Sequence, residues 1–133
     1  MSENLDLVRS IHVAHERGDY SPVEWAHPEI EYVWADRLSA GTRTGLAGMA
    51  EGWRDYLSTW EELRTVVEEY REIDEERVLV LYAFRGRGKA SGLEVGQMRG
   101  KGAGLFYVRD GKVARLVNYW DRERALADLG LEE

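Results

Sequence analysis

The chain has 133 residues, the length of a single domain, and 44% of them are hydrophobic, enough for a packed core. It contains no cysteine, which excludes disulfide bonds and thiolate chemistry. The net charge of −7 repels nucleic-acid phosphates and no apolar run reaches the length of a membrane span, so we expect no nucleic-acid or membrane partner. The first residues form neither a basic nor an apolar signal region, from which we expect a cytoplasmic protein.

Apolar residues at helical spacing begin the sequence. Leu5, Val8 and Ile11 recur three residues apart and predict a first helix. Gly18 is the expected stop of this helix, because glycine readily takes the left-handed conformation that follows a helix. Two prolines then mark residues 20–29 as a connection.

A short strand and a second helix are expected next. Ile30, Tyr32 and Trp34 alternate with other residues and predict a strand with these three on one face. A polar loop over residues 36–45 follows, and apolar residues return to helical spacing over 46–60.

Two glycines, Gly48 and Gly52, lie on one line of this second helix. Each costs about 1 kcal/mol relative to alanine in a helix. We therefore expect that they allow another backbone to come close.

The second half of the sequence is rich in strands. A long strand is expected over residues 63–73 and a turn over 74–76. Residues 77–87 contain an unbroken apolar run, which is typical of a central strand covered on both faces. After a hairpin connection over 88–92, the chain returns as a strand over 93–108. Glycines interrupt this last strand and predict bulges and strong curvature: Gly96, Gly100, Gly102 and Gly104.

A tight hairpin and a short helix end the sequence. Asp110-Gly111 between apolar segments is a two-residue hairpin signal, and the last strand follows over 113–120. Asp121 then caps a helix over 122–129, which stops at a glycine.

These elements predict one α+β domain over residues 1–133, since the strands follow the helices instead of alternating with them. No repeat, linker or low-complexity tract divides the chain. A strongly curved antiparallel sheet packed on the N-terminal helices leaves a concave interior, which is a natural site for a small molecule.

Several segments resemble the SnoaL-like branch of the nuclear-transport-factor-2-like (NTF2-like) superfamily. They are Glu-Arg-Gly-Asp (16–19), Glu-Ile-Glu-Tyr-Val (29–33), Arg-Asp-Gly-Lys-Val-Ala-Arg-Leu (109–116) and the tail over 121–131. The resemblance implies a cone-shaped fold enclosing a deep pocket and often a homodimer joined through the sheet. The superfamily includes polyketide cyclases, ketosteroid isomerases, limonene epoxide hydrolases and dehydratases, so the resemblance specifies the fold more closely than the function.

The catalytic residues of these relatives have no full counterpart in this sequence. Where the cyclases and epoxide hydrolases carry an active aspartate, a gap-free count from Gly111-Lys112 reaches Asn118, an amide that takes no proton at neutral pH. The base of the isomerases ends the first strand, and here Asp36 lies slightly beyond that point. Their helix-borne tyrosine corresponds to Ile11. Asn118 is therefore expected either to bind a ligand or to bond the backbone.

Other polar residues have two interpretations each. Asp121 is either a base or a helix cap. His27 either lines the cone mouth or is a satisfied core or rim histidine, and Arg85 either holds an anion or is solvated. His12 and His15 share one face of the first helix, where core or rim histidines are common, and we expect no metal there. The sequence has no phosphate-binding or dinucleotide motif, so we expect no cofactor.

Aromatic residues are expected to form the wall of the interior, where most belong to the core and some contact a ligand. The expected ligand-binding residues are Asn118, Trp34, Tyr32, Trp53, Tyr82, Trp120 and Arg85.

Three functions remain open. The first is binding of a small, mostly apolar organic molecule in an aromatic-lined pocket. The second is an enzyme similar to polyketide cyclases, ketosteroid isomerases or epoxide hydrolases that uses Asp36, Asp121 or His27 for acid–base chemistry. The third is a non-catalytic dimeric interaction module. We expect a homodimer, because Val117 and Tyr119 give the last strand an apolar second face.

Overall fold

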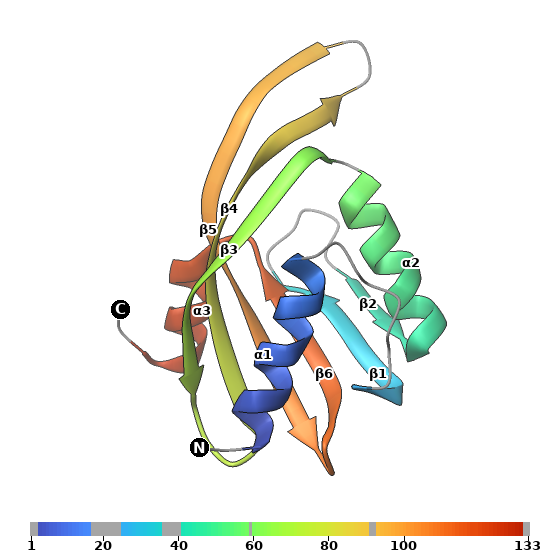
Figure 1. The fold of residues 1–133 in the computed structure, drawn as a ribbon, viewed down its shortest axis with the longest axis vertical. Coiled ribbons are helices and arrows are strands. Elements are labelled where there is room, and N and C mark those ends of the chain that lie inside the picture. The colour runs from blue at the N-terminus through green and yellow to red at the C-terminus, as the bar shows by residue number, and fades with distance from the viewer. Residues whose placement is uncertain (1–2, 17–24, 36–40, 59, 91–92, 132–133) are drawn as a thin grey trace.

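The structure is a computed structural model that describes residues 3–16, 25–35, 41–58, 60–90 and 93–131. These residues form three helices and six strands (Figure 1). In chain order they are α1 (Glu3–Glu16), β1 (Ala26–Trp34), β2 (Gly41–Thr44), α2 (Gly45–Ser58), β3 (Trp60–Glu72), β4 (Arg77–Ala90), β5 (Leu93–Arg109), β6 (Lys112–Tyr119) and α3 (Arg122–Leu129).

All six strands form one curved sheet in the order β2-β1-β6-β5-β4-β3. Neighbouring strands are antiparallel except for β1 and β6, which run parallel with Tyr32 beside Leu116 and Trp34 beside Asn118. The sheet is therefore mixed: the expected antiparallel pairing holds everywhere except at this pair. No hairpin joins β1 to β6, so no short connection forces them to run in opposite directions. The α+β class is confirmed.

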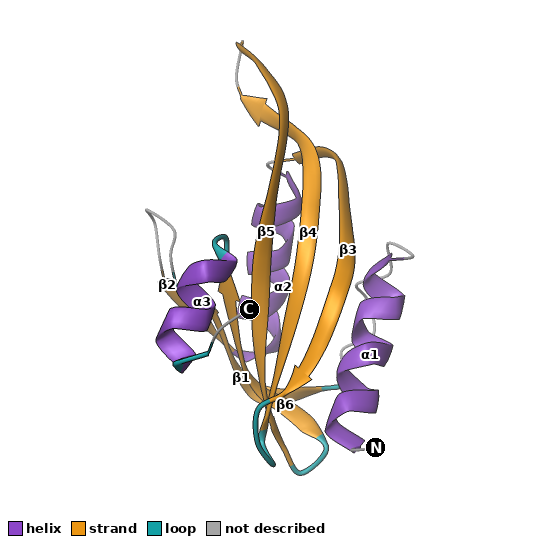
Figure 2. Ribbon diagram, turned by 90° about the vertical axis from the view of Figure 1, so that its left-hand side faces the viewer, coloured by secondary structure: helices purple, strands orange, loops and turns teal. Residues whose placement is uncertain are grey.

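Helices cover both faces of the sheet. We call the face that carries α1 and α2 the inner face and the face that carries α3 the outer face (Figure 2). The inner face packs Val8 and Ile11 of α1 and Met49 of α2 against the sheet. The outer face packs Ala125 and Leu126 of α3 against it.

Strand β4 contributes to both hydrophobic cores, as its apolar run predicts. Val78 and Val80 lie in the inner core, and Leu79 and Leu81 lie in the outer core. All four are buried, because β4 has strands on both edges and helices over both faces. A central strand covered on both faces is confirmed.

The outer face is covered more fully than the sequence suggests. Val117 and Tyr119 are buried against α3, so the last strand does not present an exposed apolar face. The reason for expecting a homodimer at these residues is thus removed, although the homodimer itself stays a prediction. Val66 of β3, 62% exposed, is the large apolar residue that this sheet leaves most open to solvent among the described residues.

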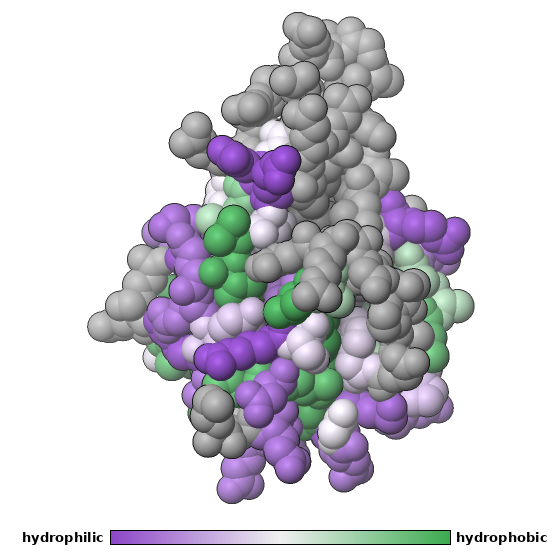
Figure 3. All heavy atoms as spheres, viewed as in Figure 1, coloured by the Kyte–Doolittle hydropathy of each residue, from purple (hydrophilic) through white to green (hydrophobic). Residues whose placement is uncertain are grey.

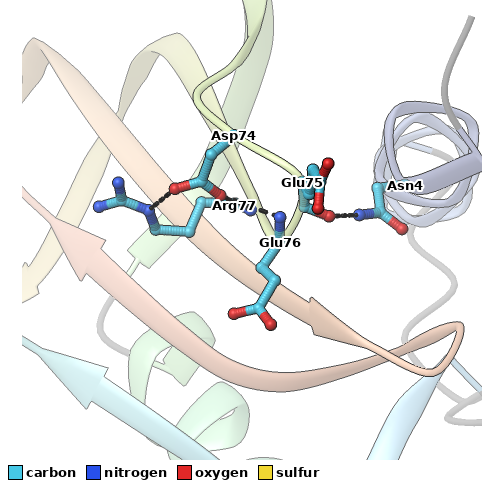
Figure 4. Close-up of polar contacts among 5 residues, drawn as sticks. All are labelled: Asn4, Asp74, Glu75, Glu76 and Arg77. Atoms are coloured by element: carbon cyan, nitrogen blue, oxygen red, sulfur yellow. Dashed lines mark hydrogen bonds and ion pairs between the residues drawn. The ribbon is translucent and has the colours of Figure 1, made fainter.

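The turn between β3 and β4 is held by hydrogen bonds, as Figure 4 shows. The Asp74 carboxylate accepts from the backbone N–H groups of Glu76 and Arg77 at 2.9 and 2.8 Å and from Arg77 Nε at 2.7 Å. These bonds, first of all the one from Glu76, lower the pKa of Asp74. Asn4 Nδ2 donates to the Glu75 carbonyl at 2.7 Å and ties the start of α1 to this turn. The turn expected over residues 74–76 is confirmed.

The glycines of β5 act differently from the expectation. Pairing of β4 with β5 is regular across Gly100, Gly102 and Gly104, and its register shifts near Gly96, between the pairs Arg87–Gln97 and Lys89–Glu94. The bulges expected at Gly100, Gly102 and Gly104 are therefore not formed in this pairing. Instead, a Cβ atom at Gly100 would lie 2.8 Å from the Phe84 ring, and one at Gly102 would lie 2.8 Å from the Tyr82 ring.

The C-terminal signals of the sequence are confirmed. Asp110 and Gly111 have φ angles of 54° and 76°, as a tight turn between right-twisted strands requires. Asp121 accepts from Glu123 N and caps α3, which ends at Gly130 in the left-handed conformation with φ 69°.

Elsewhere the boundaries differ. Strand β2 forms within a segment expected to be a loop, and β1 begins at Ala26, inside the expected connection. The expected stop of the first helix at Gly18 lies outside the described residues. Among the described helices, none has the length and hydropathy to cross a membrane.

Gly52 provides a test of helix packing. A Cβ atom there would lie 2.6 Å from Cε1 of Tyr32, a ring that is 1% exposed. We expect Gly52→Ala to lower the free energy of unfolding by about 1 kcal/mol, since overpacking costs roughly 1–3 kcal/mol and alanine returns about 1 kcal/mol of helix propensity. Gly48→Ala is the control, because its Cβ would lie 3.4 Å from Arg43 Cβ. Urea denaturation should show that only Gly52→Ala destabilises; equal effects would contradict this packing.

Tyr119 predicts how stability changes at alkaline pH. Burial, and then its hydrogen bond to Asp128 at 3.1 Å, raise the pKa of Tyr119 to about 12. A phenol with a raised folded-state pKa contributes stability that is present below its unfolded pKa of about 10 and is lost as the pH rises through the folded value. Urea unfolding at successive pH values should show this loss in the wild type and a smaller one in Tyr119→Phe. The Tyr107→Phe variant is the control and should show most of the loss of stability that the wild type shows at alkaline pH.

Candidate functional site

Aromatic rings form a connected cluster on the inner face. The rings of Trp34 and Trp120 stack at a centroid distance of 5.2 Å and an interplanar angle of 25°. Phe84 packs its ring edge-on against Trp120 at 5.2 Å, and Tyr82 lies 6.4 Å from Phe84. We call these four residues, together with Tyr32 and Trp53, the aromatic cluster. Its members come from β1, α2, β4 and the residue after β6.

The first strand anchors one side of this cluster. Trp34 Nε1 donates to the Tyr32 hydroxyl at 3.2 Å, and the Tyr32 ring lies 5.4 Å from that of Trp53. Tyr32 and Trp34 are buried, whereas Trp53, Tyr82 and Trp120 are partly exposed. The cluster thus has a buried base and partly open rings, so a small apolar molecule in contact with these rings would replace water there. From the side on which α1 lies, hydrophobic residues reach the surface between hydrophilic ones (Figure 3).

Asn118 lies on the same face as the aromatic cluster. Leu116 belongs to the inner core, whereas Val117 and Tyr119 belong to the outer core, so alternation along β6 places Asn118 on the inner side. The side chain is 5% exposed, and its Nδ2 donates to the Val33 carbonyl at 3.2 Å. Because a carbonyl only accepts, the atom facing it is the NH₂ group, and Oδ1 points elsewhere. Asn118 therefore bonds the backbone through its NH₂ group, as one of its two expected roles requires.

His12 of α1 is a partly exposed ionisable group that packs against the inner core, and its possible role there was underrated from the sequence. Its ring packs edge-on against Phe106 at 5.4 Å and Tyr70 at 6.0 Å. Nδ1 lies 3.2 Å from the Val8 carbonyl and must donate to it. Burial lowers the pKa of His12, so the ring is neutral at pH 7 and Nε2 is the unprotonated nitrogen.

Arg122, which has no recognisable motif in the sequence, links the outer face to the aromatic cluster. Its guanidinium donates to Glu68 Oε1 at 2.6 Å and to the Tyr82 carbonyl at 3.0 Å, and its side chain is 8% exposed. The hydrogen bond from Arg122 is the main cause that lowers the pKa of Glu68. The hydrogen bond to Tyr82 therefore holds the chain just after Trp120 against β4, and the ion pair holds it against Glu68 of β3.

The remaining sequence-derived candidates lie apart from the aromatic cluster. Asp121 caps α3 through its bond from Glu123 N at 3.0 Å. His27 Nδ1 accepts from Glu29 N at 3.0 Å near the start of β1. Arg85 is exposed and follows Phe84, so alternation along β4 places it on the outer side. Asp36 and the side chain of His15 lie outside the described parts.

Few polar side chains are buried in the described part of the molecule. The buried polar or charged residues among those described are Asn118 and Arg122, so no described aspartate or glutamate is buried. Nor does any group of three or more His, Asp or Glu side chains in the described ranges have the arrangement of a metal site. The described part of the site offers stacked aromatic rings, one amide and one neutral imidazole.

Comparisons with known proteins agree with this architecture. A family model described as a SnoaL-like domain matches residues 8–116. No curated protein matches the sequence. The fold is similar to that of TerC co-crystallised with polyporic acid, with a TM-score of 0.74 and 21% identity over 96% of this chain and 98% of TerC.

Two further structures share the fold. An NTF2-like protein of unknown function from Burkholderia pseudomallei K96243 has a TM-score of 0.77 and 21% identity over 96% of this chain and 97% of its own. A protein from Jannaschia sp. CCS1, provisionally assigned as a SnoaL-like polyketide cyclase, has a TM-score of 0.74 and 14% identity over 98% of this chain and 94% of its own. At these identities, the likeness establishes the fold alone.

The two interpretations of Asp121 can be separated by substitution. Asp121→Ala removes a helix cap and should lower the free energy of unfolding by about 1 kcal/mol, whereas Asp121→Asn keeps a capping oxygen and should be nearly neutral. Thermal unfolding measures both. Because Asp121 lies outside the aromatic cluster, neither variant should change ligand affinity. A loss of affinity or turnover in the stable Asp121→Asn variant would instead assign this carboxylate to the site.

Proposed function

Because the chain belongs to the SnoaL-like domain family, we propose that its inner face binds a small, mostly apolar organic molecule against the aromatic cluster. The observation that carries this proposal is the arrangement of Trp34, Phe84 and Trp120, whose rings pack at 5.2 Å in stacked and edge-on geometry. Trp120 and Tyr82 are partly exposed, so their rings have apolar surface left to offer. A flat aromatic ligand would extend this stack.

The polar groups near the cluster suit orientation of such a ligand. Asn118 supplies an amide on the same face, and an amide binds a neutral polar group without bringing a charge into an apolar core. The fold relative TerC, which was crystallised with polyporic acid, supports a small organic ligand for this fold.

A second candidate is an acid–base enzyme of the cyclase type, and the observation that favours it is His12. This imidazole is neutral at pH 7 and lies against Phe106 and Tyr70, so a base is present, whereas none of the described aspartates and glutamates is buried. The fold relative from Jannaschia sp. CCS1, provisionally assigned as a polyketide cyclase, supports this alternative. Binding is the proposal that both candidates share.

The binding proposal can be tested with 2-naphthol, a two-ring aromatic compound, by isothermal titration calorimetry. We expect saturable binding at one site per chain. Trp120→Ala should weaken it about tenfold, because an aromatic pair contributes roughly 0.5–1.5 kcal/mol beyond its buried area. Val66→Ala, on the exposed outer side of β3, is the matched control and should bind like the wild type. The absence of saturable binding, or equal losses in both variants, would overturn the proposal.

A further inference from the structure

We infer that Glu68 and Arg122 are positioning residues for the proposed ligand site, because their ion pair fixes the orientation of the Trp120 ring that the ligand would contact. The inference rests on the proposed function of the inner face. Glu68 Oε1 accepts from Arg122 Nη2 at 2.6 Å, and the Arg122 side chain is 8% exposed whereas that of Glu68 is 39% exposed. A guanidinium this far from water needs a partner that stays in place, since a buried charge without one is costly.

A bulge in β3 accounts for how Glu68 reaches Arg122. Val67 pairs with Tyr82, and Glu69 pairs with the residue before Tyr82. Two residues of β3, Glu68 and Glu69, therefore oppose a single residue of β4, which is the arrangement of a β-bulge. A bulge bends its strand and redirects a side chain. It lets the carboxylate of Glu68, on the strand at one end of the sheet, contact the first residue of α3.

Hydrogen bonds hold the chain on both sides of Trp120. Before it, the Tyr119 carbonyl accepts from the Tyr82 hydroxyl at 3.4 Å. After it, Arg122 Nη2 donates to the Tyr82 carbonyl at 3.0 Å as well as to Glu68. Tyr82 of β4 thus contacts the chain just before and just after Trp120, and the bond to Glu68 fixes the guanidinium that makes the second contact.

Gly102 of β5 lets this segment come close to the sheet. A Cβ atom there would lie 2.7 Å from the Tyr119 carbonyl oxygen and 2.8 Å from the Tyr82 ring, so a side chain would force one of them to move. The next residue back along β5, Lys101, places Nζ 3.8 Å from the same Glu68 oxygen that accepts from Arg122. Strand β5 therefore makes room for the segment and adds a second cation beside the Glu68 carboxylate.

The position of the Trp120 ring matters because stacking depends on its plane. This ring stacks on Trp34 at 5.2 Å with an interplanar angle of 25°, and it is partly exposed. Aromatic contacts are favourable only in particular relative orientations. With the main chain held before and after Trp120, the ring has fewer orientations to lose when a flat ligand packs on it, so the entropic cost of binding falls.

The orientation of the ring can be measured without a ligand. Two stacked indoles couple their electronic transitions and give circular-dichroism bands of opposite sign, which the difference between the wild type and Trp34→Phe identifies. We expect Glu68→Ala to lose most of the amplitude of these bands. Glu68→Gln keeps an oxygen that accepts from Arg122 and should retain most of it. Glu69→Ala is the matched control, because this neighbouring carboxylate pairs with Arg71, and the bands should stay unchanged.

A double-mutant cycle separates positioning from a general structural role. Calorimetry with 2-naphthol should show that Glu68→Ala weakens binding about threefold, a part of the loss expected for Trp120→Ala, because the ring remains but is no longer held. In a Trp120→Ala background, Glu68→Ala should not weaken binding further, since an effect that acts through the ring disappears with the ring. Glu68→Gln and Glu69→Ala should bind like the wild type.

The outcomes separate this inference from the proposed function. If Glu68→Ala matches Glu69→Ala in bands and affinity, or weakens binding equally with and without the Trp120 ring, the positioning role is wrong while ligand binding stands. If the wild type does not bind 2-naphthol, the proposed function fails and the role of the ion pair in binding fails with it. Thermal unfolding shows whether each variant is folded in the assay. Glu68→Thr, a good strand residue too short to replace the carboxylate, repeats the test should Glu68→Ala unfold.

Discussion

The aromatic cluster depends on the absence of side chains along one stretch of β5. The Phe84 ring lies so close to Gly100 that a Cβ atom there would be only 2.8 Å from it. The Tyr82 ring lies equally close to the Cβ position of Gly102. A residue larger than glycine would push these rings away, and Phe84 would lose its edge-on contact with Trp120. Glycine weakens a strand, because it loses more backbone entropy on folding than other residues and packs no side chain. These two glycines therefore lower the stability of β5, and they leave the space that the two rings occupy.

The features that were predictable from the sequence are those set by near neighbours. The apolar run of β4, the Asp110-Gly111 turn and the cap at Asp121 each follow from a few adjacent residues, and all are confirmed. The parallel pairing of β1 with β6 and the covering of Val117 by α3 join distant segments, and local periodicity says nothing about which segments meet. The glycine pattern was noticed but assigned to bulges, because the rings that fill the space come from the neighbouring strand.

The residues of the candidate site also fall into those that local sequence patterns predict and those that depend on distant partners. The aromatic residues expected to gather, from Tyr32 to Trp120, do gather, since alternation and amphipathic spacing place large apolar residues inside. Arg122 and His12 were missed or set aside, because a lone arginine or histidine has no motif and its role comes from partners such as Glu68 and Phe106 that are far away in sequence. The family match explains the framework, and none of the described aspartates and glutamates is buried in it.

The parallel junction of β1 and β6 also bears on how the chain reaches this structure. The hydrogen bond from Asn118 to Val33 joins residues 85 positions apart, and the same junction brings Trp34 to Trp120. Contacts of such long sequence separation form only after a large loop has closed, which costs entropy before any packing repays it. The β3–β4–β5 meander, connected by short links, can pair earlier. The aromatic cluster should therefore be completed late in folding, when β1 pairs with β6 and brings Trp34 against Trp120.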